Sequence, residues 1–448
     1  MTPTIHCGSF EAERYWRDPN LAVLPSLSDR QAMAVTEAMD ELLFVFCNDG
    51  DILLTRNVMD SAQLDYIRSI GFDIGTNRKP WLENVEQITE CQQLNVFELF
   101  NACTSKKLLL QTFPERSKIE AFAVLPGVVE IIQRCRLASR VPEQSIVQKI
   151  NAKSYSLAMR DKLDIRNVGV IVEGIPRLIE EGSRMLRAGS ILLKDEYGVS
   201  GKGNLSIDST KSLLRIAKYL ETQVAKGKTV RFILEPLLDR KTDFSCQFRI
   251  SEEGKVTILS IQQLQNNGYA FGASFTMGAA SVDRLLHLGY MDQMQQIGAS
   301  LYQEGYFGDV CVDSMILQDE TVEPIVEINA RKSMSLIKHA VDCSMVANKL
   351  YSCLTQFTLL LPSDFNYEAF LDNLRNRQLL YDLGRMTGIV PLSSGTLLSS
   401  KRGSTSTSSK STKGRLYVAV IYENEAQMDG LITGLKKSLS KAGLAIIA

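Results

Sequence analysis

The chain has 448 residues, of which 45% are hydrophobic and 23% are charged, as in ordinary globular proteins. At about 150 residues per domain, this length predicts roughly three structural units. The 50 Lys and Arg residues are balanced by 51 Asp and Glu residues, which leaves no basic excess to neutralise a phosphate backbone. We therefore expect no nucleic-acid partner.

The nine cysteines are scattered without a C-x-x-C pair, a spacing that predicts neither a zinc site nor a disulfide framework. The first sixteen residues include acidic side chains and lack the apolar segment of a secretory signal. No run approaches the ~18 apolar residues of a membrane span. These features predict a cytoplasmic protein without a membrane partner.

Alternating strand-like and helix-like runs predict an α/β or α+β fold. We expect residues 1–140 to form an open α/β domain. Its opening is predicted at the apolar runs 41–46 and 52–54, later strands at 107–110 and 120–125, and a helix within 128–138.

A second α/β unit is expected to begin near Pro142, where a helical pattern stops. We predict a small subdomain at 141–228 and a larger antiparallel-sheet domain at 229–398. The Ser-, Thr- and Lys-rich residues 399–414 predict a flexible linker, and 415–448 a small α/β segment. Two strands at 309–317 and 323–329, joined by a polar turn, predict a hairpin.

Residues 195–204 form a glycine-rich loop, DEYGVSGKGN, directly after an apolar strand that carries Lys194. Glycines 198, 201 and 203 free backbone N–H groups to approach a phosphate, and Lys194 and Lys202 would add positive charge. The loop is neither a P-loop nor a dinucleotide fingerprint. A surface turn rich in small residues is the alternative interpretation.

A second set of polar residues lies about 110 residues later in the chain. Asp313 falls inside one strand of the expected hairpin, and Glu327 and Asn329 are two apart on the other, so both leave the same face. If the strands pair, these side chains converge as the hard oxygen ligands that suit Mg²⁺. The alternative is a solvated sheet face on which the acids pair with Arg331.

Taken together, Lys194, the glycine-rich loop and the segment VEINAR resemble the ATP-grasp superfamily of carboxylate ligases. The resemblance covers roughly residues 141–346 and is most specific in VEINAR, which matches the superfamily's E-x-N-x-R signature. It implies an ATP-grasp fold with an N-terminal open α/β domain, a small lid subdomain and a C-terminal antiparallel-sheet domain. Proline at 236 and aspartate at 313, where many relatives have glutamate, depart from the pattern.

The resemblance also implies roles for individual residues. The nucleotide would contact Lys153, Lys194, Ser200, Gly201, Lys202, Gly203, Glu235, Leu237, Leu238 and Asp243. The metal ligands would be Asp313, Glu327 and Asn329. Arg331 and Lys202 would act on the transferred phosphate, and Arg249 could clamp a substrate carboxylate. The alternative for Arg249 is a cross-strand pair with Glu252 or Glu253.

The activity that the resemblance implies is ATP-dependent ligation, with ATP and Mg²⁺, or Mn²⁺ in its place, as cofactors. A carboxylate of an amino acid or peptide would become an acyl phosphate and then an amide, with release of ADP and phosphate. The chain looks most like peptide ligases of the pheganomycin type, from antibiotic biosynthesis, and like amino-acid–carrier-protein ligases. We further expect an acyl carrier protein as a partner and a homodimer as the oligomeric state. A thiol acceptor and a non-catalytic ATP-binding module remain alternatives.

Overall fold

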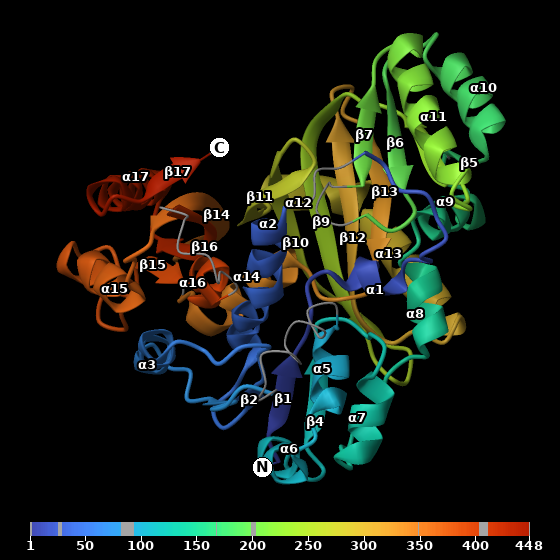
Figure 1. Cartoon of the computed structure of the whole chain (residues 1–448). Coiled ribbons are helices and arrows are strands. Elements are labelled where there is room, and N and C mark those ends of the chain that lie inside the picture. The colour runs from blue at the N-terminus through green and yellow to red at the C-terminus, as the bar shows by residue number, and fades with distance from the viewer. Residues whose placement is uncertain are drawn as a thin grey trace.

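The computed structural model describes residues 2–25, 29–81, 94–166, 168–198, 203–347, 349–402 and 411–447. Three sheets organise these residues: two of four strands and one of nine. Within the same ranges, no helix is long and apolar enough to cross a membrane. In Figure 1 the N-terminal sheet is at the bottom, a small helix-covered sheet at the upper right and the C-terminal elements at the left.

The N-terminal unit is an open parallel sheet with the strand order β3-β2-β1-β4. Ile5 of the central strand pairs with Ile52 on one side and Ile119 on the other. Its strands are β1 (Thr4–Cys7), β2 (Ile52–Leu53), β3 (Gly75–Thr76) and β4 (Lys118–Ala121). Its helices are α1 (Ala12–Trp16), α2 (Arg30–Glu37), the 3-10 helix η1 (Ala38–Phe46), α3 (Ser61–Ser69), α5 (Val96–Ala102), α6 (Lys106–Thr112) and α7 (Val128–Arg134).

Two of the apolar runs in this unit are helical and not strands. Residues 41–46 lie in η1, and 107–110 lie in α6. The Ser105 hydroxyl caps α6 by accepting a hydrogen bond from the Leu108 N–H. Leu109 is buried whereas Leu110 is exposed, which is the one-sided burial of a surface helix. The prediction of a strand at 107–110 was therefore wrong, because three consecutive leucines carry no periodicity that separates the two structures.

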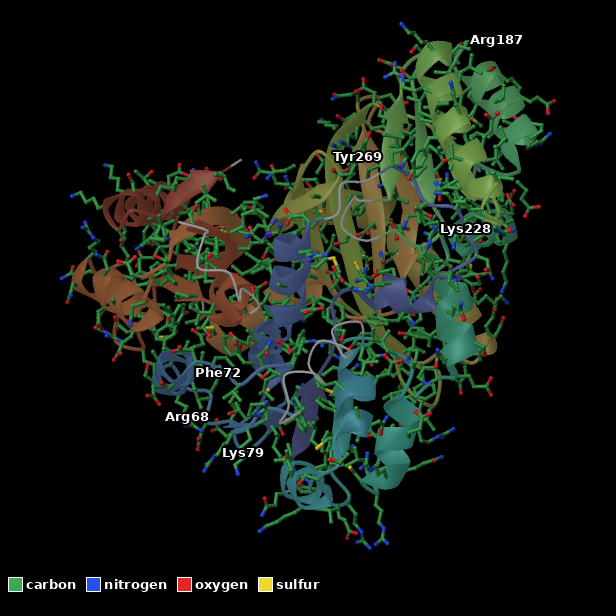
Figure 2. The ribbon with its side chains drawn as sticks, viewed as in Figure 1. Arg68, Phe72, Lys79, Arg187, Lys228 and Tyr269 are labelled. Carbon is green, nitrogen blue, oxygen red and sulfur yellow. The ribbon has the colours of Figure 1, made fainter. Side chains whose placement is uncertain are left out.

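Helices α8 (Gln144–Ile150) and α9 (Lys153–Lys162) lead into the small unit, a sheet with the order β5-β8-β6-β7. All its pairs are antiparallel, and α10 and α11 pack against it around a separate apolar core. Its far end, marked by Arg187 in Figure 2, points away from the parallel sheet. The elements are β5 (Val170–Glu173), α10 (Ile175–Met185), β6 (Ile191–Asp195), β7 (Asn204–Ile207), α11 (Thr210–Val224) and β8 (Arg231–Pro236).

The large sheet is antiparallel throughout, with the order β13-β12-β9-β10-β11-β14-β16-β15 and β17 beside β14. The predicted hairpin is present as β12 (Gly308–Leu317) and β13 (Val322–Asn329). The other strands are β9 (Arg240–Ile250), β10 (Val256–Asn267), β11 (Ala270–Thr276), β14 (Tyr351–Pro362), β15 (Gly388–Pro391), β16 (Ser411–Tyr422) and β17 (Ala445–Ile447). The helices are α12 (Ala279–His287), α13 (Tyr290–Gln303), α14 (Met334–Met345), α15 (Tyr367–Asn376), α16 (Gly395–Arg402) and α17 (Glu425–Lys441).

The C-terminal segment is part of this large sheet. Strand β16 lies between β14 and β15 and pairs with β14 along its whole length, from Ser411 to Tyr422. Of the expected linker, residues 399–402 belong to α16 and 411–414 to β16, while 403–410 lie outside the described residues. Residues 415–448 are therefore not separate from the larger domain.

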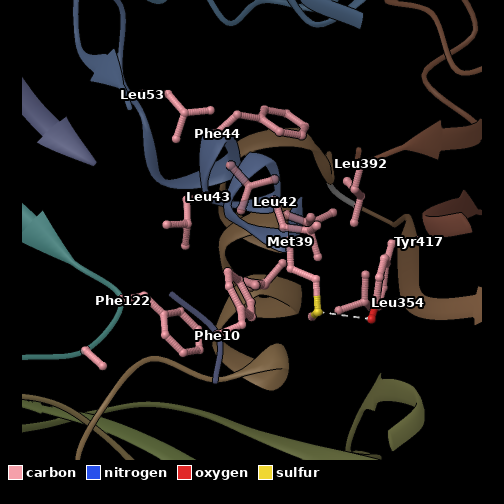
Figure 3. Close-up of a cluster of buried hydrophobic side chains, with 14 of the residues drawn as sticks. Phe10, Met39, Leu42, Leu43, Phe44, Leu53, Phe122, Leu354, Leu392 and Tyr417 are labelled. Atoms are coloured by element: carbon pink, nitrogen blue, oxygen red, sulfur yellow. Dashed lines mark hydrogen bonds between the residues drawn. The ribbon is translucent and has the colours of Figure 1, made fainter. Parts of the chain in front are cut away.

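One apolar core joins the N-terminal unit to the C-terminal strands (Figure 3). Met39 of η1 faces Tyr417 of β16, and the Tyr417 hydroxyl donates to Met39 Sδ at 3.2 Å. Phe10 and Phe122 stack in the same core, with 4.0 Å between their ring centroids. Segments almost 380 residues apart are thus held together by burial of apolar surface.

Candidate active site

The β12–β13 hairpin brings the expected metal ligands together. Asp313 lies directly opposite Glu327, and the Asn329 Nδ2 donates to Asp313 Oδ2 at 3.1 Å. Burial, together with the charge of Glu327, raises the pKa of Asp313 to about 7. Two carboxyl groups this close in a buried place favour the addition of positive charge between them.

Lys153, at the start of α9, supplies part of that charge. Its Nζ lies 2.6 Å from Glu327 Oε1 and donates to the Gly198 carbonyl at 3.3 Å. Burial alone would lower the pKa of Lys153, but the charge of Glu327 and its hydrogen bond raise it overall. Lys194 of β6 is paired in the same way with Glu235 of β8, so two of the three expected phosphate-binding lysines are held by a carboxylate.

Arg331, two residues after Asn329, has a partner from the other end of the chain. Its Nε donates to Glu13 Oε1 of α1 at 2.8 Å, and its Nη2 donates to Asn329 Oδ1 at 3.1 Å. Burial opposes the charge of Arg331, while Glu13 raises the pKa of its guanidinium. The guanidinium also lies 5.8 Å from the centre of the Phe122 ring. Arg331 is therefore fixed beside the hairpin acids.

The ends of the glycine-rich loop meet closely. The Asp195 N–H donates to the Gly203 carbonyl at 2.7 Å. A Cβ built on Gly203 would stand 2.6 Å from the Gly198 Cα, a contact that no side chain could make. Glycine is thus required at both positions by the close backbone approach. The expected phosphate contacts of Ser200, Gly201 and Lys202 lie outside the described residues.

Strand β9 and the β10–β11 turn form another part of the site. Asp243 of β9 accepts from Arg240 Nη1 at 3.0 Å and from Asn266 Nδ2 at 2.9 Å. Tyr269, labelled in Figure 2, lies in the turn with the Arg240 guanidinium 6.0 Å from its ring centre. Asp243 is thus kept in place by two donors.

A single cavity of about 780 Å³ connects these groups. It lies between the small unit and the large sheet and reaches α2 and the strands β14 and β16. The expected site residues that line it are Lys153, Lys194, Glu235, Leu237, Leu238, Asp243, Asp313, Glu327, Asn329 and Arg331. Its size falls within the range of small-molecule sites.

The structure does not bring Arg249 into this cavity. Its Nε donates to Asp309 Oδ1 at 2.8 Å and its Nη2 to Glu120 Oε2 at 2.7 Å. Lys332 Nζ completes the cluster, 2.6 Å from Asp309 Oδ2. Arg249 lies six residues further along β9 than Asp243, roughly 20 Å at a strand's rise per residue. The expected substrate clamp is therefore a structural ion pair, and its partners are not Glu252 or Glu253.

The donor set fits a divalent cation. Oxygen atoms of two carboxyl groups and one amide are the ligands that Mg²⁺ takes in proteins, usually with substrate phosphates completing the shell. Burial and the neighbouring charge of Glu327 raise the pKa of Asp313 to about 7, so its ionised form would be stabilised by a cation at this place. Among the described residues, no three or more His, Cys, Asp and Glu side chains lie together in a way that could hold a metal ion.

Sequence reasoning missed several residues of the site. Glu13, Arg160 and Asn266 are examples, and Arg160 is paired with Glu323 at 2.6 Å in the cavity wall. None of them belongs to a local motif. Only the packing of α1, α9 and β10 around the hairpin gives them a place there.

No family model matches the chain. It is 22% identical over 363 residues to a [Butirosin acyl-carrier protein]--L-glutamate ligase from Niallia circulans, covering 78% of this chain and 77% of that protein.

Similar solved structures include an N5-carboxyaminoimidazole synthetase from Staphylococcus aureus in complex with ADP, with a TM-score of 0.51 and 11% identity over 97% of this chain and 96% of that one. Another is a biotin carboxylase from Campylobacter jejuni, with a TM-score of 0.52 and 11% identity over 100% and 92% of the two chains. Both neighbours are ATP-grasp ligases, and their structures extend over almost the whole of this chain. The fold predicted from VEINAR and the glycine-rich loop is confirmed: the chain has the ATP-grasp fold.

Proposed function

We propose that the chain is an ATP-dependent carboxylate–amine ligase. It would convert a carboxylate of an amino acid or peptide to an acyl phosphate and join it to an amine, releasing ADP and phosphate. The observation that carries the proposal is the single cavity in which Glu327, opposite Asp313, pairs with Lys153, and which Lys194 and Gly198 of the glycine-rich loop also line. Its arrangement matches the demands of phosphoryl transfer to an anion.

Phosphoryl transfer between two anions requires fixed positive charge and little water. Lys153 and Lys194 are buried, line the cavity and are held in place by Glu327 and Glu235, so they supply fixed positive charge there. Arg331 is held beside Asn329, where it could neutralise the acyl-phosphate oxygens. Ser200, Gly201, Lys202 and Gly203 are proposed to cover the phosphates.

The remaining expected contacts concern the nucleoside and the metal. Glu235, Leu237 and Leu238 are proposed to hold the adenine ring and Asp243 the ribose hydroxyls, since all four line the cavity. Asp313, Glu327 and Asn329 would hold Mg²⁺ or Mn²⁺. When bound, the metal supplies positive charge at the phosphate oxygens.

A second candidate is ligation of an amino acid to the thiol of a carrier protein. The relative from Niallia circulans favours it, because its name gives an acyl-carrier protein and L-glutamate as the joined partners. The same relative supports a role in specialised-metabolite biosynthesis. Both candidates share the first, ATP-consuming step and differ only in the acceptor.

The test is phosphate release from ATP with Mg²⁺ across libraries of carboxylates and amines, with and without a phosphopantetheinylated carrier protein. The ligase predicts ADP and phosphate, and no AMP, only when a carboxylate and an acceptor are both present. Dependence on an amine supports the first candidate, and dependence on the carrier supports the second. ATP binding without turnover on any substrate would contradict both and favour a non-catalytic module.

A further inference from the structure

The cavity has a second polar end, formed by β14 and β16. Arg415 of β16 lines it, half-buried, and its Nε is buried without a hydrogen-bond partner. The other Lys and Arg residues among the described lining are each paired with a carboxylate: Lys153, Arg160, Lys194, Arg240 and Arg331. Arg415 differs because no carboxylate of the described residues pairs with it.

The Arg415 guanidinium is fixed on one side only. Its Nη1 donates to the Tyr417 hydroxyl at 3.2 Å, and that hydroxyl in turn donates to Met39 Sδ (Figure 3). Tyr417 is itself buried, so the pair forms a rigid support. The Nε of Arg415 is buried without a partner, and no hydrogen bond joins its Nη2 to the described residues. Nε and Nη2 together form one of the guanidinium edges that bind a carboxylate through two parallel hydrogen bonds.

Gln356 of β14 offers a complementary group. It lies opposite Tyr417 in the strand register, so Gln356, Tyr417 and Arg415 share one face of the sheet. Its Nε2 donates to the Phe271 carbonyl at 2.5 Å, which orients the amide, while its Oε1 is buried without a partner. This end of the cavity therefore presents an unused cationic donor and an unused acceptor.

This end of the cavity lies apart from the hairpin acids Asp313 and Glu327. Strands β12 and β16 are separated by five strand steps, roughly 24 Å along the sheet. Between them the cavity wall includes Leu264 and Phe271, which are apolar. A group bound at Arg415 would therefore not share the place of the phosphates proposed to lie between Lys153 and Lys194.

We infer that Arg415 and Gln356 form a subsite for a substrate carboxylate that is not activated, carried next to an N–H donor. The inference rests on the proposed ligase function and names the part of the same cavity that holds the end of an amino acid or peptide. Arg415 binds the carboxylate, and Gln356 Oε1 accepts from the ammonium or amide nitrogen beside it. A fully ionised phosphate fits less well, because it carries no hydrogen that it could donate to Gln356 Oε1.

The experiment is calorimetric binding to the full chain, with and without a non-hydrolysable ATP analogue and Mg²⁺. The probes are L-alanine, L-glutamate and glycylglycine, each paired with its C-terminal amide. We expect at least one acid to bind about tenfold or more tightly than its amide, as one charged hydrogen-bonded pair would give. Arg415→Gln should remove this preference and leave the affinity for the ATP analogue unchanged.

Two variants control for folding and for charge. Lys413→Gln removes a positive charge from the same strand, but Lys413 lies outside the cavity and pairs with Asp29 at 3.0 Å, so the preference should persist. Gln356→Glu leaves Arg415 in place and adds a negative charge, so it should weaken the binding of the acids more than the binding of their amides. Melting temperatures of all variants check that each is folded.

The subsite would be overturned if the ratio of acid affinity to amide affinity were the same in the wild type and in Arg415→Gln. It would also be overturned if the wild type bound none of the probes. Failure of the ligase proposal gives a different result. In that case no pair of substrates gives phosphate release from ATP, while the acid preference is still present and still depends on Arg415.

Discussion

The Arg331 Nε donates to Oε1 of Glu13 at 2.8 Å, although 318 residues separate the two in the sequence. The pair joins helix α1 of the N-terminal unit to the end of strand β13 and fixes the arginine of the E-x-N-x-R segment. Glu13 is almost fully buried, with only 3% of its side chain exposed. The position of Arg331, which is proposed to act at the acyl phosphate, is thus set by a residue outside the motif.

Replacing Glu13 by glutamine should therefore affect both stability and activity. The change leaves Arg331 buried without its charged partner, at a cost of about 1.5–3 kcal/mol for a hydrogen bond to a charged group. Denaturant unfolding measures the free-energy loss, and phosphate release should fall because Arg331 is no longer fixed. Glu115→Gln is the control, since Glu115 forms an exposed pair with Arg136 and should matter little. Equal stability of Glu13→Gln and Glu115→Gln would contradict the role of the pair.

Glu327→Gln tests the hairpin acids. The substitution keeps the shape of the side chain but removes the charge that faces Asp313 and holds Lys153. We expect phosphate release to fall on the order of 100-fold or more, with the chain still folded by circular dichroism. Glu320→Gln removes the same charge from the turn of the same hairpin, outside the cavity, and should keep full activity. Near-wild-type phosphate release by Glu327→Gln would refute the metal assignment.

Asp40 predicts a pH dependence of stability. Burial raises the pKa of this carboxyl from its ordinary 3.8 to about 8, although the Arg56 N–H donates to it. The fold therefore holds a proton that the unfolded chain releases above pH 3.8. The contribution of Asp40 to the free energy of unfolding should fall as pH rises through this window, by at most about 1.4 kcal/mol per pH unit.

Asp40→Asn keeps a neutral side chain at every pH and so isolates that contribution. The variant should match the wild type near pH 4 and become increasingly more stable than it toward pH 8, as measured by denaturant unfolding. Asp372→Asn changes an exposed aspartate of α15 and should follow the wild-type pH profile. A stability difference between Asp40→Asn and the wild type that does not grow with pH would show that Asp40 is ionised in the fold.

Truncation tests whether the C-terminal segment belongs to the larger domain. A chain ending at Arg402 lacks β16, which pairs with both β14 and β15 and buries Leu416, Val418 and Val420. We expect this chain to lose cooperative unfolding, because it lacks the strand that joins β15 to β14 and the apolar side chains that this strand buries. A chain ending at Leu444 loses only β17, a short strand at the margin of the sheet, and should stay folded. Cooperative unfolding of the shorter chain would show that the segment is dispensable.

The sequence by itself determined the local parts of this protein. Alternation along a strand places Glu327 and Asn329 on one face, and a polar turn closes the hairpin that sets Asp313 opposite Glu327. The glycines at 198 and 203 are required by a close backbone approach within one short loop. The hairpin depends on neighbours a few residues away, so periodicity and residue type were enough to predict it, whereas the sequence predicted the glycines only as a phosphate-binding loop or a surface turn.

Only the tertiary structure decided the rest. It paired Arg331 with Glu13, Arg249 with Asp309 and Glu120, and placed β16 inside the large sheet, where Arg415 lines the cavity. Each of these depends on which distant strands and helices become neighbours. That choice is made by burial of apolar surface over the whole chain, as between Met39 and Tyr417, and no local pattern records it.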